Sequence, residues 1–509
     1  MNLCINDMPL TLQDLRAVWE ESLQVTIGAS AGQKIAASAA VIRDVLAKGE
    51  QVYGVNTGFG QLAQVRISDD DLAQLQVNLV LSHAVGVGPL LPDSIVRLTM
   101  VMKIMALAQG NSGARLELVN SLCALVSNDI YPCIPSKGSV GASGDLAPLA
   151  HMAGALIGAG DVRVNGVQMP ASDALVNAGL APLVLAPKEG LALLNGTQVS
   201  TALALAALFR SERLLSAAVV AGALAADAIK GSDTPFDARI HEVRGHAGQI
   251  AVAKRLRELM LGSEIRASHV GCSRVQDPYS IRCQPQIAGA CLDVMRHVAG
   301  VLNTEANAVT DNPLVFVDTG EILSGGNFHA EPIAFAADYL ALAIAEIGSL
   351  SERRTALLID SHLSGLPAFL VENGGLNSGY MIHQVTSAAL ASENKSLAHP
   401  ASVDSIPTSA NQEDHVSMAT FAANRLHTML DNSANIVAIE LLASAQGIEF
   451  HRPKRSSEVL EGVVARIRAS SPACTQDRSM AADIAEVADL IEAGVFVENG
   501  RAFLPSYDQ

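Results

Sequence analysis

Long stretches of helical pattern are the feature that most constrains the fold of this chain. They cover residues 284–307, 331–359, 379–398 and 413–448, and an Ala-rich helix that reaches about Lys230 precedes them. At the rise of an α-helix, the last stretch alone would span about 54 Å. Helices of this length bury their apolar faces against one another. The chain is therefore expected to be mainly α, with a long-helix bundle as its largest part.

Residues 333–350 place a further limit on the assembly. Their polar face is narrow, and the charged residues that interrupt the apolar pattern are Asp338 and Glu346, eight positions apart. A helix that is apolar nearly all round has to be covered on most sides. We therefore expect the bundle to continue across a subunit interface, although the pattern alone indicates only that the protein is not a monomer. The two charges argue against a transmembrane span.

The helical pattern changes character near residue 200. Before this point, the sequence predicts helices at Thr11–Glu21, 34–48 and 68–86, and a short hairpin over 161–170 that turns at Asn165-Gly166. A chain of 509 residues is long enough for more than one core. We therefore expect an N-terminal domain over residues 1–200. The bundle and a C-terminal helical region are expected over residues 201–509.

Composition and charge exclude several classes of function. A formal net charge of −17 argues against a nucleic-acid partner, because phosphates are neutralised by clustered Lys and Arg. The seven cysteines are odd in number and scattered without a Cys-x-x-Cys pair, so neither a disulfide framework nor a zinc knuckle is indicated. The first residues lack the basic and apolar regions of a signal peptide. A soluble, reduced, cytoplasmic protein is expected.

The most informative stretch for chemistry is the glycine-rich segment Gly138–Met152, in which Ser143 lies between Ala142 and Gly144. In a tight turn, the amide nitrogen of Gly144 can attack the carbonyl carbon of Ala142 and close a five-membered ring. Loss of water, and of the Ser143 hydroxyl as a second water, leaves a methylidene group, an electrophile that no ordinary side chain supplies. Glycine permits the close approach. The alternative is an ordinary loop that starts a helix, with Asp145 as its N-cap.

The full string Gly-Ser-Val-Gly-Ala-Ser-Gly-Asp-Leu-Ala-Pro-Leu-Ala-His resembles the self-processing segment of the aromatic amino acid lyases, the family of histidine, phenylalanine and tyrosine ammonia-lyases. The cofactor of this family is 4-methylidene-imidazol-5-one (MIO). Further matches extend over roughly residues 50–450: Tyr53-Gly-Val-Asn-Thr-Gly-Phe-Gly, Leu-Leu-Asn195-Gly-Thr-Gln, Val-Gln276-Asp-Pro-Tyr279-Ser-Ile-Arg282, Gly-Gly-Asn-Phe328-His and Ser409-Ala-Asn-Gln-Glu413-Asp-His-Val-Ser-Met.

The resemblance implies an architecture and a cofactor. The fold would be the ammonia-lyase type of long-helix bundle, similar to fumarase and aspartase, with the MIO loop in a mixed, mostly helical N-terminal domain. MIO would form from Ala142, Ser143 and Gly144, with no metal and no external cofactor. The protein would be a homotetramer whose active sites combine loops from more than one subunit. The sequence itself contains no His-Glu-x-x-His motif or closely spaced set of metal ligands.

In this family, MIO takes up the amino nitrogen of the substrate and makes it a good leaving group, so that the protein itself acts as the electrophile. A general base then removes the β-proton. The resemblance favours Tyr53 as this base, with Tyr279 and Glu413 as alternatives. Arg282 would clamp the substrate carboxylate with its planar guanidinium. The remaining matched residues would donate to the carboxylate or the MIO oxygen, or pack against the rings: Asn195, Gln276 and Phe328.

The resemblance also bears on the substrate. His83 matches the selectivity position beside the substrate ring, and Met381 is expected to line the same pocket. The sequence Gln-Glu413-Asp-His is similar to that of the histidine-specific members, whereas the phenylalanine and tyrosine enzymes tend to carry Gln at this position. Glu413 and His83 could pair with the ring nitrogens of histidine, and a buried carboxylate would disfavour a phenyl ring. We therefore expect L-histidine to give trans-urocanate and ammonia, the first step of histidine catabolism.

Several alternatives remain open at this stage. His383 stands where a small residue is expected, and it could narrow the pocket or add a second imidazole contact. A phenylalanine or tyrosine ammonia-lyase, or an aminomutase, is the alternative within the family. Outside it, a non-catalytic helical scaffold would be expected to lose polar site residues, yet Tyr53, Ser143, Arg282 and Glu413 are all present.

Overall fold

The computed structural model describes residues 1–52, 54–57, 67–68, 71–269 and 275–507. Interleaved parts of the chain form two compact units. The first contains Met1–Ala206, Gly300–Asp338 and Pro400–Asn424, and the second contains Ala207–Ala299, Tyr339–His399 and Arg425–Gln509. Helices dominate both units, as expected from the sequence.

The first unit combines helices with four small sheets in its described part. β1 pairs parallel with β2, β3 pairs antiparallel with β5, β4, β6 and β7 form a three-stranded sheet, and β8 pairs with β9. The strands are β1 (Asn2–Ile5), β2 (Gln24–Ile27), β3 (Val87–Leu90), β4 (Ile130–Pro132), β5 (Pro135–Lys137), β6 (Asp161–Val164), β7 (Val167–Pro170), β8 (Leu314–Phe316) and β9 (Glu321–Leu323). The helices are α1 (Leu12–Glu20), α2 (Ala29–Ala47), α3 (Leu72–His83), α4 (Asp93–Ala108), α5 (Leu116–Ser127), α6 (Leu146–Leu156), α7 (Ala171–Asn177) and α8 (Glu189–Leu194).

Local sequence signals explain where several of these elements begin and turn. Thr11 and Asp14 form a reciprocal capping box that starts α1 one residue after the predicted Thr11. The predicted hairpin is confirmed, because β6 and β7 join through Asn165 (φ 51°) and Gly166 (φ 76°), the two positive-φ residues of a type I′ turn. α2 begins at Ala29, before the predicted Lys34.

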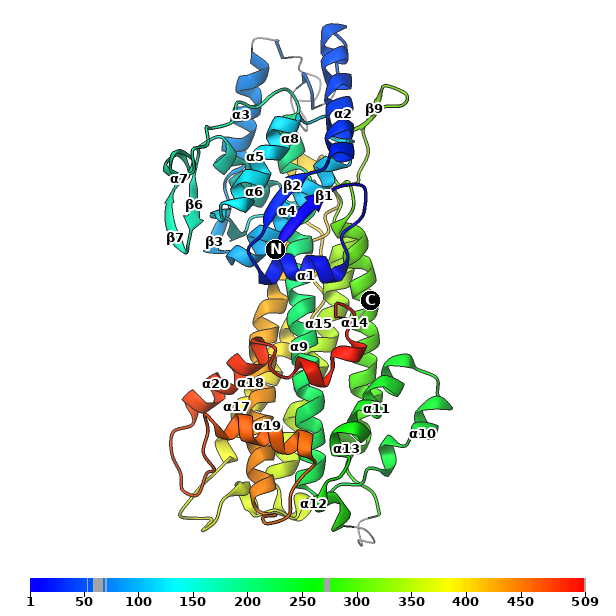
Figure 1. The fold of residues 1–509 in the computed structure, drawn as a ribbon, viewed down its shortest axis with the longest axis vertical. Coiled ribbons are helices and arrows are strands. Elements are labelled where there is room, and N and C mark those ends of the chain that lie inside the picture. Colours follow the sequence, from blue (N-terminus) through cyan, green and yellow to red (C-terminus); the bar gives the residue numbers. More distant parts are fainter. Residues whose placement is uncertain (53, 58–66, 69–70, 270–274, 508–509) are drawn as a thin grey trace. The chain divides into compact units, whose positions relative to one another are not determined.

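The second unit is built mainly from long helices that run alongside one another (Figure 1). Four of them, α9 (Gln198–Ala228), α14 (Gln284–Ala306), α15 (Glu331–Ile359) and α18 (Ala419–Glu449), have residues in both units. The other helices of the second unit are α10 (Ala238–Glu242), α11 (Ala247–Met260), α12 (Glu264–Ala267), α13 (Tyr279–Arg282), α16 (Ser361–Ser364), α17 (Met381–Leu397), α19 (Glu458–Arg468) and α20 (Ala481–Glu492). The predicted long helices are thus present.

The start of the last long helix differs from the prediction. α18 begins at Ala419, not at residue 413. Met418 has a φ of 58°, a left-handed conformation that interrupts a helix, and its amide donates to the Val140 carbonyl at 2.8 Å. The segment before α18 therefore forms a loop, because its hydrogen bonds go to a distant part of the chain.

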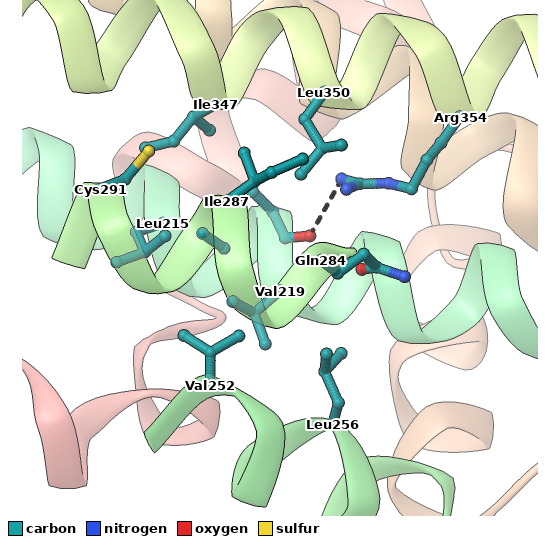
Figure 2. Close-up of a pocket in the computed structure, with 12 residues that line it drawn as sticks. Leu215, Val219, Val252, Leu256, Gln284, Ile287, Cys291, Ile347, Leu350 and Arg354 are labelled. Carbon is teal, nitrogen blue, oxygen red and sulfur yellow. Dashed lines mark hydrogen bonds between the residues drawn. The ribbon is translucent and has the colours of Figure 1, made fainter. Parts of the chain in front are cut away.

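Polar contacts hold the helices of the second unit together within an apolar core. The buried Arg354 of α15 donates from Nη2 to Glu440 of α18 at 2.7 Å and to the Ala218 carbonyl of α9 at 3.3 Å. Figure 2 shows Arg354 at one end of a small, mostly apolar pocket between α9, α11, α14 and α15. No residue that the sequence predicts for the active site lines this pocket, so we regard it as a packing feature of the bundle.

α15 is long and apolar enough to cross a membrane by length and composition, but 67% of its most apolar window is buried inside the structure, as in a core helix.

One face of α15 nevertheless leaves a row of large apolar side chains in contact with solvent. Phe335, Tyr339 and Leu342 are 60%, 44% and 52% exposed, and their spacing of four and three residues places them on the same face.

Candidate active site

The Gly138–Met152 segment forms a tight turn between β5 and α6. Its three glycines, Gly138, Gly141 and Gly144, have φ values of 140°, 67° and 71°. Residues that carry a Cβ rarely adopt such backbone angles. A Cβ on Gly144 would lie 2.2 Å from the carbonyl oxygen of Gly196, so this position requires glycine on steric grounds as well. The turn therefore places the backbone of Gly144 in contact with the backbone of Gly196, which is distant in the sequence.

Ser143, at the centre of this turn, has two hydrogen-bonding partners from distant segments. Its hydroxyl donates to Glu413 Oε1 at 2.6 Å. Its carbonyl oxygen accepts from Asn195 Nδ2 at 2.7 Å. The structure thus brings together three residues that the sequence analysis assigned to one site. Ala142, on the other side of Ser143, is buried.

Asp145 anchors the turn from the following position. It precedes α6 as expected of an N-cap, but its side chain makes no capping hydrogen bond to that helix. The buried carboxylate instead accepts from the Ser139 hydroxyl (2.9 Å), the Thr420 hydroxyl (2.6 Å), and both the amide (2.7 Å) and the hydroxyl (3.0 Å) of Ser200. Asp145 therefore connects the turn to the first residues of α9 and α18.

Asn195 is positioned by the short helix α8, which ends directly before it. Lys103, a buried residue of α4, donates from Nζ to the Asn195 carbonyl at 2.7 Å and to the Ala192 carbonyl at 3.1 Å. Burial lowers the pKa of Lys103 to about 8, although the charges of Asp311 and Asp145 act in the opposite direction. Sequence analysis missed this residue. The feature of the sequence that could have revealed it is a single charged residue inside the apolar run Met-Val-Met-Lys-Ile-Met.

Both carboxylate oxygens of Glu413 accept hydrogen bonds from hydroxyl groups of other residues. Oε1 accepts from Ser143, and Oε2 accepts from the Thr408 hydroxyl at 2.6 Å and the Ser409 hydroxyl at 2.9 Å. Burial by itself raises the pKa of Glu413, but these three hydrogen bonds and the nearby charge of His83 outweigh it and lower the pKa below its ordinary value. Glu413 is therefore a carboxylate at neutral pH.

His83 and Phe328 also lie in the first unit. His83 is the last residue of α3, and its Nδ1 lies 2.8 Å from the Leu79 carbonyl and 3.1 Å from the Ser82 hydroxyl. Because His83 acts electrostatically on Glu413, the two predicted selectivity residues are neighbours. Phe328 is partly buried in the loop that precedes α15.

Tyr53 lies outside the described residues, but Asn56, three positions later, is described. The Asn56 side chain accepts from the Val52 amide at 2.9 Å and donates to the Glu50 carbonyl at 2.8 Å. Gly54 has a φ of 72°. Residues 54–57, the described part of the tyrosine motif, therefore form a turn.

The other predicted site residues belong to the second unit. The Arg282 guanidinium lies 4.6 Å from the centre of the Tyr279 ring, an arrangement that suits a cation–π contact. Arg282 Nε is buried and has no hydrogen-bond partner among the described residues. Tyr279 is 69% exposed, and Gln276 is exposed as well. Met381, the first residue of α17, is exposed too.

His383 occupies a position where a small residue was expected, and the structure shows which side chain it contacts. The His383 ring packs against the ring of the buried Tyr380, with 4.6 Å between centroids and 37° between planes. Burial lowers the pKa of His383, so the imidazole is neutral at neutral pH. The contact with Tyr380 gives His383 a packing role inside the second unit.

Comparisons with known proteins agree with this arrangement. The family model described as "Aromatic amino acid lyase" matches residues 10–469. Histidine ammonia-lyase of Aromatoleum aromaticum is 59% identical over 98% of this chain and 94% of its own length. The crystal structure of histidine ammonia-lyase from Trypanosoma cruzi superimposes with a TM-score of 0.91 at 41% identity, over 99% of this chain and 96% of that one.

A third protein extends the comparison to a different reaction. Tyrosine aminomutase from Streptomyces globisporus superimposes with a TM-score of 0.93 at 35% identity, over 98% of both chains. The fold is therefore common to enzymes with different products, and the substrate has to be argued from the site. With a family model that covers most of its length and relatives identical at more than half of their positions, the chain belongs to the aromatic amino acid lyase family, whose members use MIO.

Proposed function

We propose that this protein is a histidine ammonia-lyase, a carbon–nitrogen lyase that converts L-histidine to trans-urocanate and ammonia. The observation that carries the proposal is the position of Ser143, whose hydroxyl donates to Glu413 while its carbonyl accepts from Asn195. The similarity to proteins named histidine ammonia-lyase over nearly the whole chain supports the same assignment.

The turn fits the formation of MIO from Ala142, Ser143 and Gly144. The positive φ of Gly144 and its contact with Gly196 leave no room for a Cβ, as expected of a backbone that has to close on itself. Asn195 donates to the Ser143 carbonyl, which would become the ring carbonyl. Asn195 Oδ1 is buried and has no partner among the described residues. When formed, MIO supplies the electrophile for the substrate amino group. Asn195 is then oriented to hold negative charge that develops on the carbonyl oxygen.

Glu413 and His83 support histidine as the substrate. Glu413 is ionised at neutral pH, and Thr408 and Ser409 fix its Oε2. Its Oε1 accepts from the Ser143 hydroxyl, which leaves as water when MIO forms, so Oε1 can then accept a hydrogen bond from an imidazole N–H. A phenyl ring in the same place would leave Oε1 without this hydrogen bond, at a penalty of about 1–3 kcal/mol. The arrangement therefore favours a substrate ring that carries an N–H group.

We assign the other steps to residues that the family motifs match. Arg282 is suited to bind the substrate carboxylate, since its buried Nε has no hydrogen-bond partner in the described chain. Gln276 would donate to the same carboxylate, and Phe328 and Met381 would pack against the rings. Tyr53 remains our candidate for the base that removes the β-proton, with Tyr279 and Glu413 as alternatives.

We further propose a homotetramer with active sites shared between subunits. The exposed apolar row Phe335, Tyr339 and Leu342 on α15 supports association, because an isolated subunit would leave this face in water. The exposure of Tyr279 supports a site completed by a neighbouring copy. We expect the protein in the cytoplasm, where its cysteines stay reduced: Cys4, Cys123, Cys133, Cys283, Cys291 and Cys474 are free.

Ultraviolet absorbance during incubation with L-histidine, L-phenylalanine and L-tyrosine, each alone, tests the proposal. Each elimination product is a conjugated acrylate with its own absorbance band. We expect the urocanate band with histidine only, and its loss in Ser143→Ala. A cinnamate or coumarate band would keep the reaction and contradict the assignment of the pocket. Absence of any band, together with a β-amino acid product, would favour an aminomutase.

A further inference from the structure

Three side chains in the first unit form a cluster that the proposed reaction does not use. His329, Glu331 and His415 each place one possible metal-ligand atom within 4.8 Å of the others. His329 lies in the loop before α15, and Glu331 is the first residue of that helix. His415 lies in the loop before α18. The ligands come from parts of the chain more than eighty residues apart, which is why no spacing motif revealed them.

The hydrogen bonds around the cluster suit a cation. Glu331 Oε2 is buried and has no hydrogen-bond partner in the part of the chain that the structure describes, although a buried carboxylate oxygen normally has one. His329 Nε2 lies 3.2 Å from the His415 backbone carbonyl and can donate to it, so Nδ1 is left for a metal. Histidines that bind metals commonly donate their other ring nitrogen to a carbonyl in this way.

The chemistry of the three side chains selects the kind of ion. Two imidazoles and one carboxylate are a ligand set that binds Zn²⁺ and similar first-row transition metals, whereas Ca²⁺ and Mg²⁺ prefer oxygen ligands alone. His415 is exposed, so water could complete the coordination shell. The His329 and His415 rings are 5.7 Å apart between centroids, and small side-chain rotations would bring their nitrogens to a common ion.

We propose that His329, Glu331 and His415 form a binding site for a divalent transition-metal ion, with Zn²⁺ as the best match. This site is separate from the proposed MIO chemistry and does not depend on it.

The position of this site gives it a structural role. The two segments that supply its ligands both contact the backbone of the MIO-forming turn: the Ala330 amide and the Ser417 hydroxyl donate to the Gly141 carbonyl, at 3.4 and 3.0 Å, and the Met418 amide donates to Val140. An ion between His329 and His415 would tie these segments together. Binding is therefore expected to stabilise the folded protein.

Isothermal titration calorimetry with Zn²⁺, on the purified full-length protein after treatment with a chelator, tests the site. We expect one equivalent of Zn²⁺ per chain and a rise in the thermal unfolding midpoint. Glu331→Gln keeps the shape of the side chain and removes its charge, and His415→Ala removes an exposed ligand. Each should weaken Zn²⁺ binding at least tenfold and abolish the rise in midpoint. If His415→Ala does not fold, Glu331→Gln decides the matter.

Two controls separate this site from other effects. His362→Ala removes an exposed histidine elsewhere and should bind Zn²⁺ as the wild type does. Ser143→Ala, which cannot form MIO, should also bind normally, so a failure of the proposed reaction would leave this result intact. No Zn²⁺ binding to the wild type, or unchanged binding in both Glu331→Gln and His415→Ala, would overturn the proposal.

Discussion

Ser143 owes its position to residues that are remote from it in sequence. Glu413 and Asn195 contact it directly. Lys103 holds the backbone of Asn195, and Asp145 links the turn to the first residues of α9 and α18. The family motifs predicted the direct contacts, because Ser143, Asn195 and Glu413 each stand in a recognisable string. The supporting roles of Lys103 and Asp145 could not be predicted, since they depend on buried carbonyls and hydroxyls that only the folded chain brings near.

The Gly144→Ala substitution should block formation of the ring. The added Cβ would lie 2.2 Å from the Gly196 carbonyl oxygen, in addition to the strain of a positive φ. We expect a chain that keeps the full translated mass and has no lyase activity. Gly160→Ala is the matched control, because Gly160 has a similar φ of 74° and nothing within 4 Å of an added Cβ. Normal ring formation in Gly144→Ala would show that the close contact is not required.

Lys103 should make the stability of the protein depend on alkaline pH. Its pKa is about 8 in the folded chain and 10.5 ordinarily. The folded chain therefore loses the proton first, and stability attributable to Lys103 is fully present above pH 10.5 and lost as pH falls through 8. The free energy of unfolding of the wild type, relative to that of Lys103→Met, should rise between these pH values by up to about 1.4 kcal/mol per pH unit. Thermal unfolding at several pH values measures this difference. Parallel curves would contradict this assignment.

The long helices were predictable from their apolar periodicity, because a helical pattern sustained over twenty or more residues is compatible with few other structures. The ends of these helices were harder to predict. α18 was expected from residue 413 but begins at Ala419, because Ser417 and Met418 bond to Gly141 and Val140 instead of continuing the helix. Such an end is fixed by tertiary contacts. The pattern of apolar positions also does not predict which polar residues are buried inside the bundle.

The Arg354–Glu440 pair between α15 and α18 provides a test of this packing. Both side chains are almost fully buried, so Arg354→Leu would leave the Glu440 carboxylate unpaired in an apolar core. We expect a loss of about 3–5 kcal/mol in the free energy of unfolding, whereas a buried pair replaced on both sides is commonly near neutral. The double variant Arg354→Leu/Glu440→Leu should therefore be more stable than Arg354→Leu in thermal unfolding. A double variant that is less stable still would indicate that the pair itself contributes net stability.

For the molecule as a whole, composition indicated an oligomer but gave no interface. The structure adds a candidate, the apolar row on α15 formed by Phe335, Tyr339 and Leu342. The predicted site residues in turn are divided between the two units, Ser143, Asn195 and Glu413 in the first and Tyr279 and Arg282 in the second. A pattern along one chain cannot show whether residues of different copies would meet in the shared site that we propose.

The Leu342→Asp substitution tests whether this row is an interface. A charge placed on an apolar contact surface would have to be desolvated on association, so we expect light scattering to report a smaller assembly and the lyase activity to fall with it. Val243→Asp is the control, because Val243 is also apolar and is 88% exposed. An assembly of unchanged size in Leu342→Asp would exclude the row from an interface.

The most direct measurement of the central claim is the intact mass of the purified protein. If Ala142, Ser143 and Gly144 form MIO, the active wild type will be lighter than its translated sequence by two water molecules, and Ser143→Ala will have its full translated mass. An active wild-type protein with the full translated mass would contradict the account, because its electrophile would then have to come from elsewhere.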